Sequence, residues 1–257
     1  MIHFYEYKSF NTQQDAILRS TASNSCYYEN FLTEKEFNFC RKMVMHVKKW
    51  PEVGAVSKYL GFGENDVLGK KLKWLSKKIK NLIPHVEVDF FAIQEAINPW
   101  KIHADIRYQD KKIPYKVILI PMDVEPLTGP VSPEQWPETY TISFHQRNFL
   151  ANNENYAKMH GEKGQYGNKQ SDWKRPMENS QIEGLVPGYH IKKDIWQKYF
   201  CHLPYNFFEG LTIDTINPWK PKSMFYWDNT ALHCADNFLS KNIRTKRCLM
   251  MFTHYKK

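Results

Sequence analysis

The chain has 257 residues, of which 42% are hydrophobic and 15% aromatic, and its formal net charge is +9. This length and apolar content are ordinary for one large domain with a buried core, which we expect to span residues 1–257. No apolar run reaches the length of a transmembrane helix, and the N-terminus lacks the basic-then-apolar order of a signal peptide. Five cysteines without C-x-x-C spacing favour reduced thiols, so the expected location is cytoplasmic.

The positive charge is concentrated in two segments. Residues 41–82 hold eleven Lys and Arg against three acids, and residues 239–257 hold six without an acid. Basic segments attract polyanions, so nucleic acid is an open partner. The alternative is a solvated outer face of supporting helices, and the spacing of the lysines over residues 66–82 favours it.

Two amphipathic helices are predicted in the first third of the chain. Thr33 and Glu36 form a capping box, and the helix that they open should end near Trp50, before Pro51. A second helix is predicted over Asp66–Leu82, where leucine and isoleucine recur at helical spacing. We expect residues 1–85 to be a helical buttress on the outside of a barrel.

Beyond residue 85 the pattern is that of short strands separated by turns. The predicted strands are Val86–Ala96, Lys101–Tyr108, Tyr115–Met122, Tyr140–Phe144, Lys222–Trp227 and Arg247–Thr253. Strands without intervening helices indicate an antiparallel double-sheet barrel. The expected fold is therefore mainly β with supporting helices, a double-stranded β-helix (jelly roll) built from residues 86–147 and 215–257.

The stretch between these two parts, residues 148–214, has a different composition. Its first half is rich in Asn, Lys, Gly and Gln, and a short helix is predicted over Lys192–Cys201. It also contains Tyr and Trp, in which a disordered linker would be poor. Long insertions of this kind are usually functional, so we expect a substrate-covering insert or lid over the barrel mouth.

The most informative motif is His103-Ala104-Asp105. In a strand, residues i and i+2 share a face, so His103 and Asp105 would lie side by side, with apolar neighbours opposite. With His233 they would form two histidines and one carboxylate, the facial arrangement of non-haem Fe(II) oxygenases. Two other H-x-E triplets, His85–Glu87 and His160–Glu162, lack this context.

The end of the chain extends the pattern. A turn and a short aromatic strand, Pro221–Asn229, lead to His233, and a last strand begins at Arg247. This order resembles the closing part of the Fe(II)/2-oxoglutarate-dependent dioxygenases, and the phytanoyl-CoA and prolyl-hydroxylase-like branches look closest. The resemblance covers residues 86–252, interrupted by residues 148–214.

The resemblance implies roles for particular residues. His103, Asp105 and His233 would bind Fe(II) and carry catalysis, and Arg247 would hold the distal carboxylate of 2-oxoglutarate, with Tyr115 and Gln94 as further co-substrate contacts. Ascorbate would serve as a reductant. Many members have Ser or Thr two residues after the arginine, whereas this chain has Leu249. Arg244 competes with Arg247, and strand parity favours Arg247.

The implied reaction is hydroxylation of a C–H bond with release of succinate and CO2. The substrate class stays open among a protein side chain, a nucleobase and a small metabolite. Two alternatives also stay open, a cupin-type metalloenzyme without 2-oxoglutarate and a basic barrel-fold binding protein acting on nucleic acid. The sequence does not predict an oligomeric state.

Overall fold

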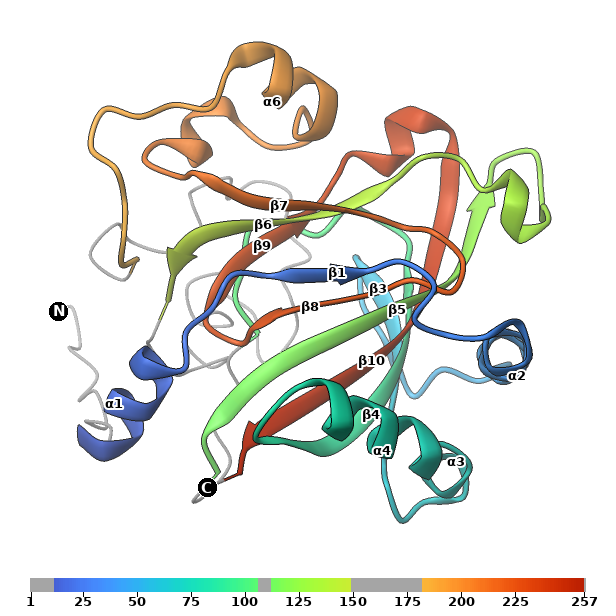
Figure 1. Ribbon diagram of the computed structural model, residues 1–257. Coiled ribbons are helices and arrows are strands. Elements are labelled where there is room, and N and C mark those ends of the chain that lie inside the picture. Colours follow the sequence, from blue (N-terminus) through green and yellow to red (C-terminus); the bar gives the residue numbers. More distant parts are fainter. Residues whose placement is uncertain (1–11, 106–111, 149–181, 257) are drawn as a thin grey trace, which may run out of the picture.

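Two antiparallel sheets face each other in the computed structural model, which describes residues 12–105, 112–148 and 182–256 (Figure 1). The major sheet has seven strands in the order β1-β8-β5-β10-β4-β3-β2. The minor sheet has three, in the order β7-β6-β9. The strands of the major sheet are β1 (Cys26–Tyr28), β2 (Glu52–Val53), β3 (Ser57–Gly63), β4 (Val86–Ala96), β5 (Pro114–Pro126), β8 (Met224–Asp228) and β10 (Ile243–Tyr255). Those of the minor sheet are β6 (Tyr140–Arg147), β7 (Ile213–Pro218) and β9 (Ala231–Ala235). The predicted mainly β, double-sheet fold is confirmed.

The long strand β10 is the central strand of the major sheet, and its side chains alternate between the two faces of that sheet. It pairs with β4 on one side and with β5 on the other, so both of its edges are hydrogen-bonded to neighbouring strands. Leu249 and Met251 point to the outer face, whereas Cys248, Met250 and Phe252 point toward the minor sheet. Both faces are apolar, because one packs on helices and the other lines the space between the sheets.

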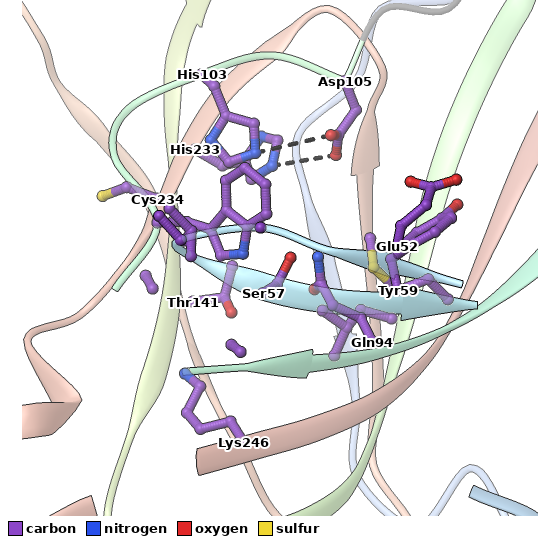
Figure 2. A pocket seen from close by; sticks show the side chains of 18 of the residues that line it. Glu52, Ser57, Tyr59, Gln94, His103, Asp105, Thr141, His233, Cys234 and Lys246 are labelled. Atoms are coloured by element: carbon purple, nitrogen blue, oxygen red, sulfur yellow. Dashed lines mark ion pairs between the residues drawn. The ribbon is translucent and has the colours of Figure 1, made fainter. Parts of the chain in front are cut away.

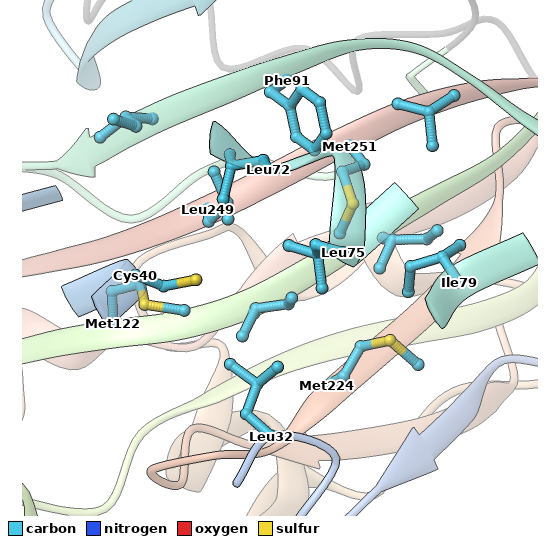
Figure 3. Close-up of a cluster of buried hydrophobic side chains, with 14 of the residues drawn as sticks. Leu32, Cys40, Leu72, Leu75, Ile79, Phe91, Met122, Met224, Leu249 and Met251 are labelled. Atoms are coloured by element: carbon cyan, nitrogen blue, oxygen red, sulfur yellow. The ribbon is translucent and has the colours of Figure 1, made fainter. Parts of the chain in front are cut away.

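The outer face of the major sheet is covered by α2 (Glu34–Met45), α3 (Val67–Lys71) and α4 (Lys73–Leu82) (Figure 1). Leu72, Leu75 and Ile79 are fully buried against this face, as Figure 3 shows. The capping box is confirmed, since Thr33 Oγ1 accepts from the Glu36 backbone and Glu36 accepts from Thr33 N. The single helix predicted over residues 66–82 is instead broken at Leu72.

Shortly before the break between α3 and α4, the α3 backbone at Gly69 passes very close to the end of β3. A Cβ on Gly69 would lie 1.9 Å from the carbonyl oxygen of Gly63 at the end of β3. Only glycine lets the helix pass this near the strand. The exposed lysines of both helices point away from the sheet into solvent, as a solvated outer face requires.

The first 85 residues are more than a helical buttress. Besides α1 (Thr12–Ser20) and α2–α4, they contribute β1, β2 and β3, so the major sheet combines strands from the N-terminal third of the chain with strands from its C-terminal part. Sequence periodicity missed β3 because its residues are mostly half-buried and do not alternate cleanly. The remaining described elements are the short turns of 3-10 helix η1 (Pro133–Gln135), η3 (Tyr205–Phe208) and η4 (Phe238–Lys241), and the helix α6 (Lys193–Tyr199).

The described part of the expected lid, residues 182–212, packs behind the minor sheet. Phe200 and Phe208 lie on Phe144 of β6, in a cluster that also holds Leu232. Figure 1 shows α6 on the side of the minor sheet that faces away from the major sheet. This half of the segment is therefore a cover for the back of the minor sheet, and residues 149–181, expected to cover the mouth, lie outside the described residues. In the described parts of the chain, we find no helix with the length and apolar character to cross a membrane.

Replacing Thr33 with alanine should destabilise the protein by about 1 kcal/mol, because the backbone N–H of Glu36 in the first turn of α2 loses its side-chain acceptor. Urea unfolding followed by circular dichroism measures the change. Ser132, which precedes η1 and makes no side-chain cap, provides the control, and its replacement by alanine should leave the midpoint nearly unchanged. Equal effects of the two substitutions would contradict the capping role.

Candidate metal and co-substrate site

His103, Asp105 and His233 come together along the β9 edge of the minor sheet. His233 lies on β9, and His103 forms an isolated antiparallel bridge with it through two backbone hydrogen bonds of 3.0 and 2.9 Å. Asp105 N donates to Asn229 O at 3.0 Å. The strand predicted over residues 101–108 is thus only a bridge at His103 within its described part, because the chain leaves β9 after one residue pair.

The alternation on which the prediction depended is nevertheless present. Ile102 is buried and Ala104 partly buried in the cluster behind the minor sheet. His103 and Asp105 therefore point to the opposite side, into the space between the sheets, where Figure 2 shows them beside His233.

The three side chains offer a compact set of donor atoms. Nε2 of His233 lies 3.1 Å from Asp105 Oδ2, and Nε2 of His103 lies 3.7 Å from Asp105 Oδ1. One atom from each residue falls within 4.8 Å of the other two. Ligands at adjacent positions on a divalent metal with bonds of about 2.1 Å lie roughly 3 Å apart. A small closure around an ion would give that spacing.

Both imidazoles are held in the tautomer that a metal requires. Nδ1 of His103 lies 2.7 Å from the carbonyl oxygen of Lys101, and Nδ1 of His233 lies 3.1 Å from that of Ala231. A carbonyl only accepts, so each Nδ1 carries a hydrogen, and in the neutral form of the ring Nε2 is then the atom with the lone pair. Such second hydrogen bonds orient metal-bound histidines.

Electrostatics also keeps His103 neutral. Burial and, to a smaller extent, the neighbouring His233 lower its pKa, Asp105 and the Lys101 carbonyl oppose the shift only in part, and the resulting pKa is about 4. His103 and His233 are 8% and 4% exposed. At neutral pH His103 is therefore a lone-pair donor and not a cation.

The triad opens into a cavity of about 480 Å³ between the two sheets. Its walls come from β3, β4, β5 and β10 on one side and from β6 and β9 on the other. Figure 2 shows the triad at one end and Lys246 at the other, with Thr141, Ser57 and Gln94 between them. Small side chains such as Ala96 and Ala235 leave this space open.

Lys246 was not predicted from the sequence as a site residue. It is 1% exposed, and its Nζ donates to Thr139 Oγ1 and Tyr140 O, each at 3.1 Å. Nζ also lies 3.6 Å from Asp236 Oδ1 and 4.1 Å from the centre of the Trp219 ring. Burial lowers the pKa of Lys246 to about 8 while Asp236 opposes the shift, so the amine is mostly charged at neutral pH.

Arg247, the predicted co-substrate residue, points to the other face of β10. Its Nε donates to Glu95 Oε2 and its Nη1 lies 3.2 Å from Met45 Sδ, on the side covered by α2. It is not among the described residues that line the cavity. The alternation of side chains along the strand correctly placed Arg247 on the same face as Leu249 and Met251, but that face is the outer one, which packs on the helices. The competing Arg244 pairs with Glu125 and is largely exposed.

Of the two other predicted co-substrate contacts, one lines the cavity and the other does not. Gln94, on β4, lines the cavity as expected. Tyr115 does not line it within the described residues; its ring packs edge-on against Tyr255, with Lys116 Nζ 4.5 Å from the ring centre. Tyr115 stands at the start of β5, and its side chain packs on the outer side of the sheet.

Arg247 and Lys58 instead stabilise a buried carboxylate. Glu95 is 2% exposed; burial alone would raise its pKa, but Lys58 and Arg247 outweigh burial and the net pKa is lowered. A lowered folded-state pKa gives stability above the unfolded value that is lost as the pH falls through the folded value. Glu95→Gln should therefore cost roughly 1–3 kcal/mol at pH 7. The difference from the natural protein should shrink below about pH 4.5 in urea unfolding curves, and a constant difference would contradict the ion-pair explanation.

Three solved structures share this fold at very low sequence identity. The chain matches the non-heme α-ketoglutarate-dependent epimerase SnoN from nogalamycin biosynthesis with a TM-score of 0.52 and 8% identity, covering 95% of this chain and 87% of SnoN. SnoN in complex with Fe3+, α-ketoglutarate and nogalamycin RO matches with a TM-score of 0.51 and 9% identity, with the same coverage of both chains. The non-heme α-ketoglutarate-dependent carbocyclase SnoK matches at 0.51 and 10%, covering 97% and 88%.

Comparisons of sequence alone give no match, either to a family model or to a curated protein. The likeness to SnoN and SnoK therefore shows the fold, and the chemistry has to be argued from the residues of this chain. Those residues provide two imidazoles and one carboxylate at one end of a cavity and one buried amine at the other.

Proposed function

We propose that this chain is an Fe(II)- and 2-oxoglutarate-dependent oxygenase that oxidises a C–H bond of an unidentified substrate and releases succinate and CO2. The observation that carries the proposal is the convergence of His103, Asp105 and His233 in a cavity that also receives Lys246. The shared fold with SnoN, whose complex holds Fe3+ and α-ketoglutarate, supports it.

The donor set fits Fe(II). Two neutral nitrogens and one carboxylate on one side of a metal leave its other positions open for a bidentate organic ligand and O2. Both histidines have their Nδ1 bound to the backbone, so the ligand atoms are already oriented. His103, Asp105 and His233 would hold the iron, and iron with 2-oxoglutarate and O2 would supply the oxidising power.

The cavity fits a dicarboxylate beside the metal. The keto acid end would lie at the triad, and Lys246 would receive the distal carboxylate in place of Arg247. Thr141 Oγ1 accepts from Trp219 Nε1 at 2.9 Å, so its own hydroxyl hydrogen can be donated into the cavity it lines. A charged amine and a hydroxyl are suitable donors for a carboxylate.

The remaining residues orient the reactants and exclude water. Trp227 and Phe252 are 1% and 5% exposed and line the cavity, so they shield the reaction from solvent. Asn229 fixes the backbone of Asp105 through its carbonyl oxygen. Hydroxylation is the expected outcome, and because the same fold serves an epimerase and a carbocyclase, product analysis belongs to the test.

Purified protein loaded anaerobically with Fe(II) and 2-oxoglutarate, then exposed to O2, tests the proposal. We expect formation of succinate that requires both additions, at a slow rate without substrate, and a faster rate when the right metabolite pool is added. Metal binding without any 2-oxoglutarate binding would favour the cupin-type alternative. Failure to bind Fe(II), Mn(II) or Ni(II) would overturn the proposal.

We further propose that residues 1–257 act as one catalytic domain in a reducing compartment such as the cytoplasm. The support for the compartment is that all five cysteines are free thiols, three of them buried. The basic segments do not support a nucleic-acid substrate, because the exposed lysines of α3 and α4 lie on the outer side of the major sheet, away from the cavity.

A further inference from the structure

We infer that the substrate is a small molecule with a flat, aromatic or similarly apolar body and no anionic group. It enters past residues 51–57 and reaches the metal between Trp100 and Trp227. This inference rests on the proposed function, since the metal and the co-substrate are taken to occupy the inner part of the cavity.

The mouth of the cavity is formed by one short segment. All seven residues from Pro51 to Ser57 line it, and most of them are exposed to solvent. The segment is fixed to the end of β4, because Ile97 N donates to Val56 O at 2.9 Å and Asn98 Nδ2 donates to Ala55 O at 2.6 Å. At this entrance Val53 is 61% exposed, an apolar side chain placed where a ligand would pass.

Aromatic rings border the path from the mouth to the metal. The Trp100 ring lies 5.1 Å from that of His103, and the Trp227 ring lies 4.5 Å from that of His233, measured between centres. Tyr59 and Phe252 line the same cavity. Indole and phenyl faces favour flat apolar groups by offset or edge-on packing.

The charges at the cavity disfavour an anion. Of the described residues that line it, three are charged at neutral pH: Glu52, Asp105 and Lys246. Asp105 belongs to the metal, and Lys246 is already paired with Asp236 and is assigned to the co-substrate. Glu52, at the mouth, is the charge that remains, so a carboxylate or phosphate on the substrate would meet repulsion.

The size of the space matches a small molecule. A cavity of about 480 Å³ is within the usual range for small-molecule sites, and 2-oxoglutarate would fill only part of it. A body of two fused rings is therefore a suitable probe, and its charge can be varied while its shape is kept.

Three naphthalene probes test the inference: 2-naphthylmethylamine, 2-naphthalenemethanol and 2-naphthoate. Each is titrated calorimetrically into protein loaded with Ni(II) and 2-oxoglutarate, so that binding is measured without turnover. We expect the amine and the alcohol to bind, and naphthoate to bind about tenfold more weakly than the amine, as one nearby charge at intermediate dielectric allows. Equal binding of naphthoate and the amine, or no binding of the amine and the alcohol to loaded protein, would overturn the inference.

Matched variants place the effect at the mouth. Glu52→Gln should reduce the difference in dissociation constant between the amine and naphthoate. Glu134→Gln, at an exposed acid outside the cavity, should leave that difference unchanged. Val53→Lys should reverse the order and favour naphthoate. Val67 is 74% exposed on α3 outside the cavity, so Val67→Lys is the control and should change nothing. Equal effects of the lysine variants at Val53 and Val67 would contradict entry past residues 51–57.

The inference and the proposed function fail separately. The neutral 2-naphthalenemethanol is also titrated into metal-free protein, where its binding depends on the rings and not on iron. Binding there without any metal or 2-oxoglutarate binding would support the aromatic site and count against the oxygenase. Metal and 2-oxoglutarate binding with no affinity for the alcohol or the amine would do the reverse.

Discussion

Replacement of His233 with alanine should abolish tight metal binding. In the proposed site the side chain would provide one of three donors, and its Nε2 lies 3.1 Å from the Asp105 carboxylate that would share the ion. Loss of a mere supporting hydrogen bond to a metal ligand costs about 10–100-fold in affinity, so loss of the ligand itself should cost more than about 100-fold. Isothermal titration with Mn(II) or Ni(II) under anaerobic conditions measures the change.

His145 provides a matched control for this substitution. It is a histidine on the minor sheet, with a side chain that is 48% exposed and lies 3.8 Å from Asp214. His145→Ala should bind metal like the natural protein, and circular dichroism should show both variants folded. Retention of full metal affinity by a folded His233→Ala variant would refute the assignment of the triad.

Replacement of Lys246 with methionine should weaken 2-oxoglutarate binding about 10–100-fold, because a charge-assisted hydrogen bond contributes roughly 1.5–3 kcal/mol. Metal affinity should stay nearly unchanged, since the amine lies at the other end of the cavity. Methionine keeps most of the side-chain volume. Asp236 retains Lys241 and Thr139 as partners, at 2.6 Å each, so the fold should tolerate the change.

Arg247→Leu is the control that separates the two neighbouring cations of β10. Its partner Glu95 lies on the outer side of the sheet, so we expect lower stability in urea and an unchanged dissociation constant for 2-oxoglutarate. The opposite result, a co-substrate defect in Arg247→Leu and none in Lys246→Met, would show that the distal carboxylate binds elsewhere.

Local sequence patterns correctly predicted several parts of this protein. The capping box at Thr33 is explained by contacts within one turn, and the strand predicted over Val86–Ala96 has the bounds of β4. The alternation around His103 placed two donors on one side because a single residue step reverses the face of an extended chain. These features depend on neighbours in sequence, so the sequence could determine them.

Other features depended on which surface each element meets. Lys246 and Arg247 are adjacent on a strand that is apolar on both faces, and no local pattern tells which face meets the minor sheet. The second half of the expected lid likewise contains aromatics that any large apolar surface could bury, and they meet the back of the minor sheet. The hydrophobic periodicity of the sequence predicts that a side chain is buried. Which surface buries it depends on how the two sheets and the helices pack together.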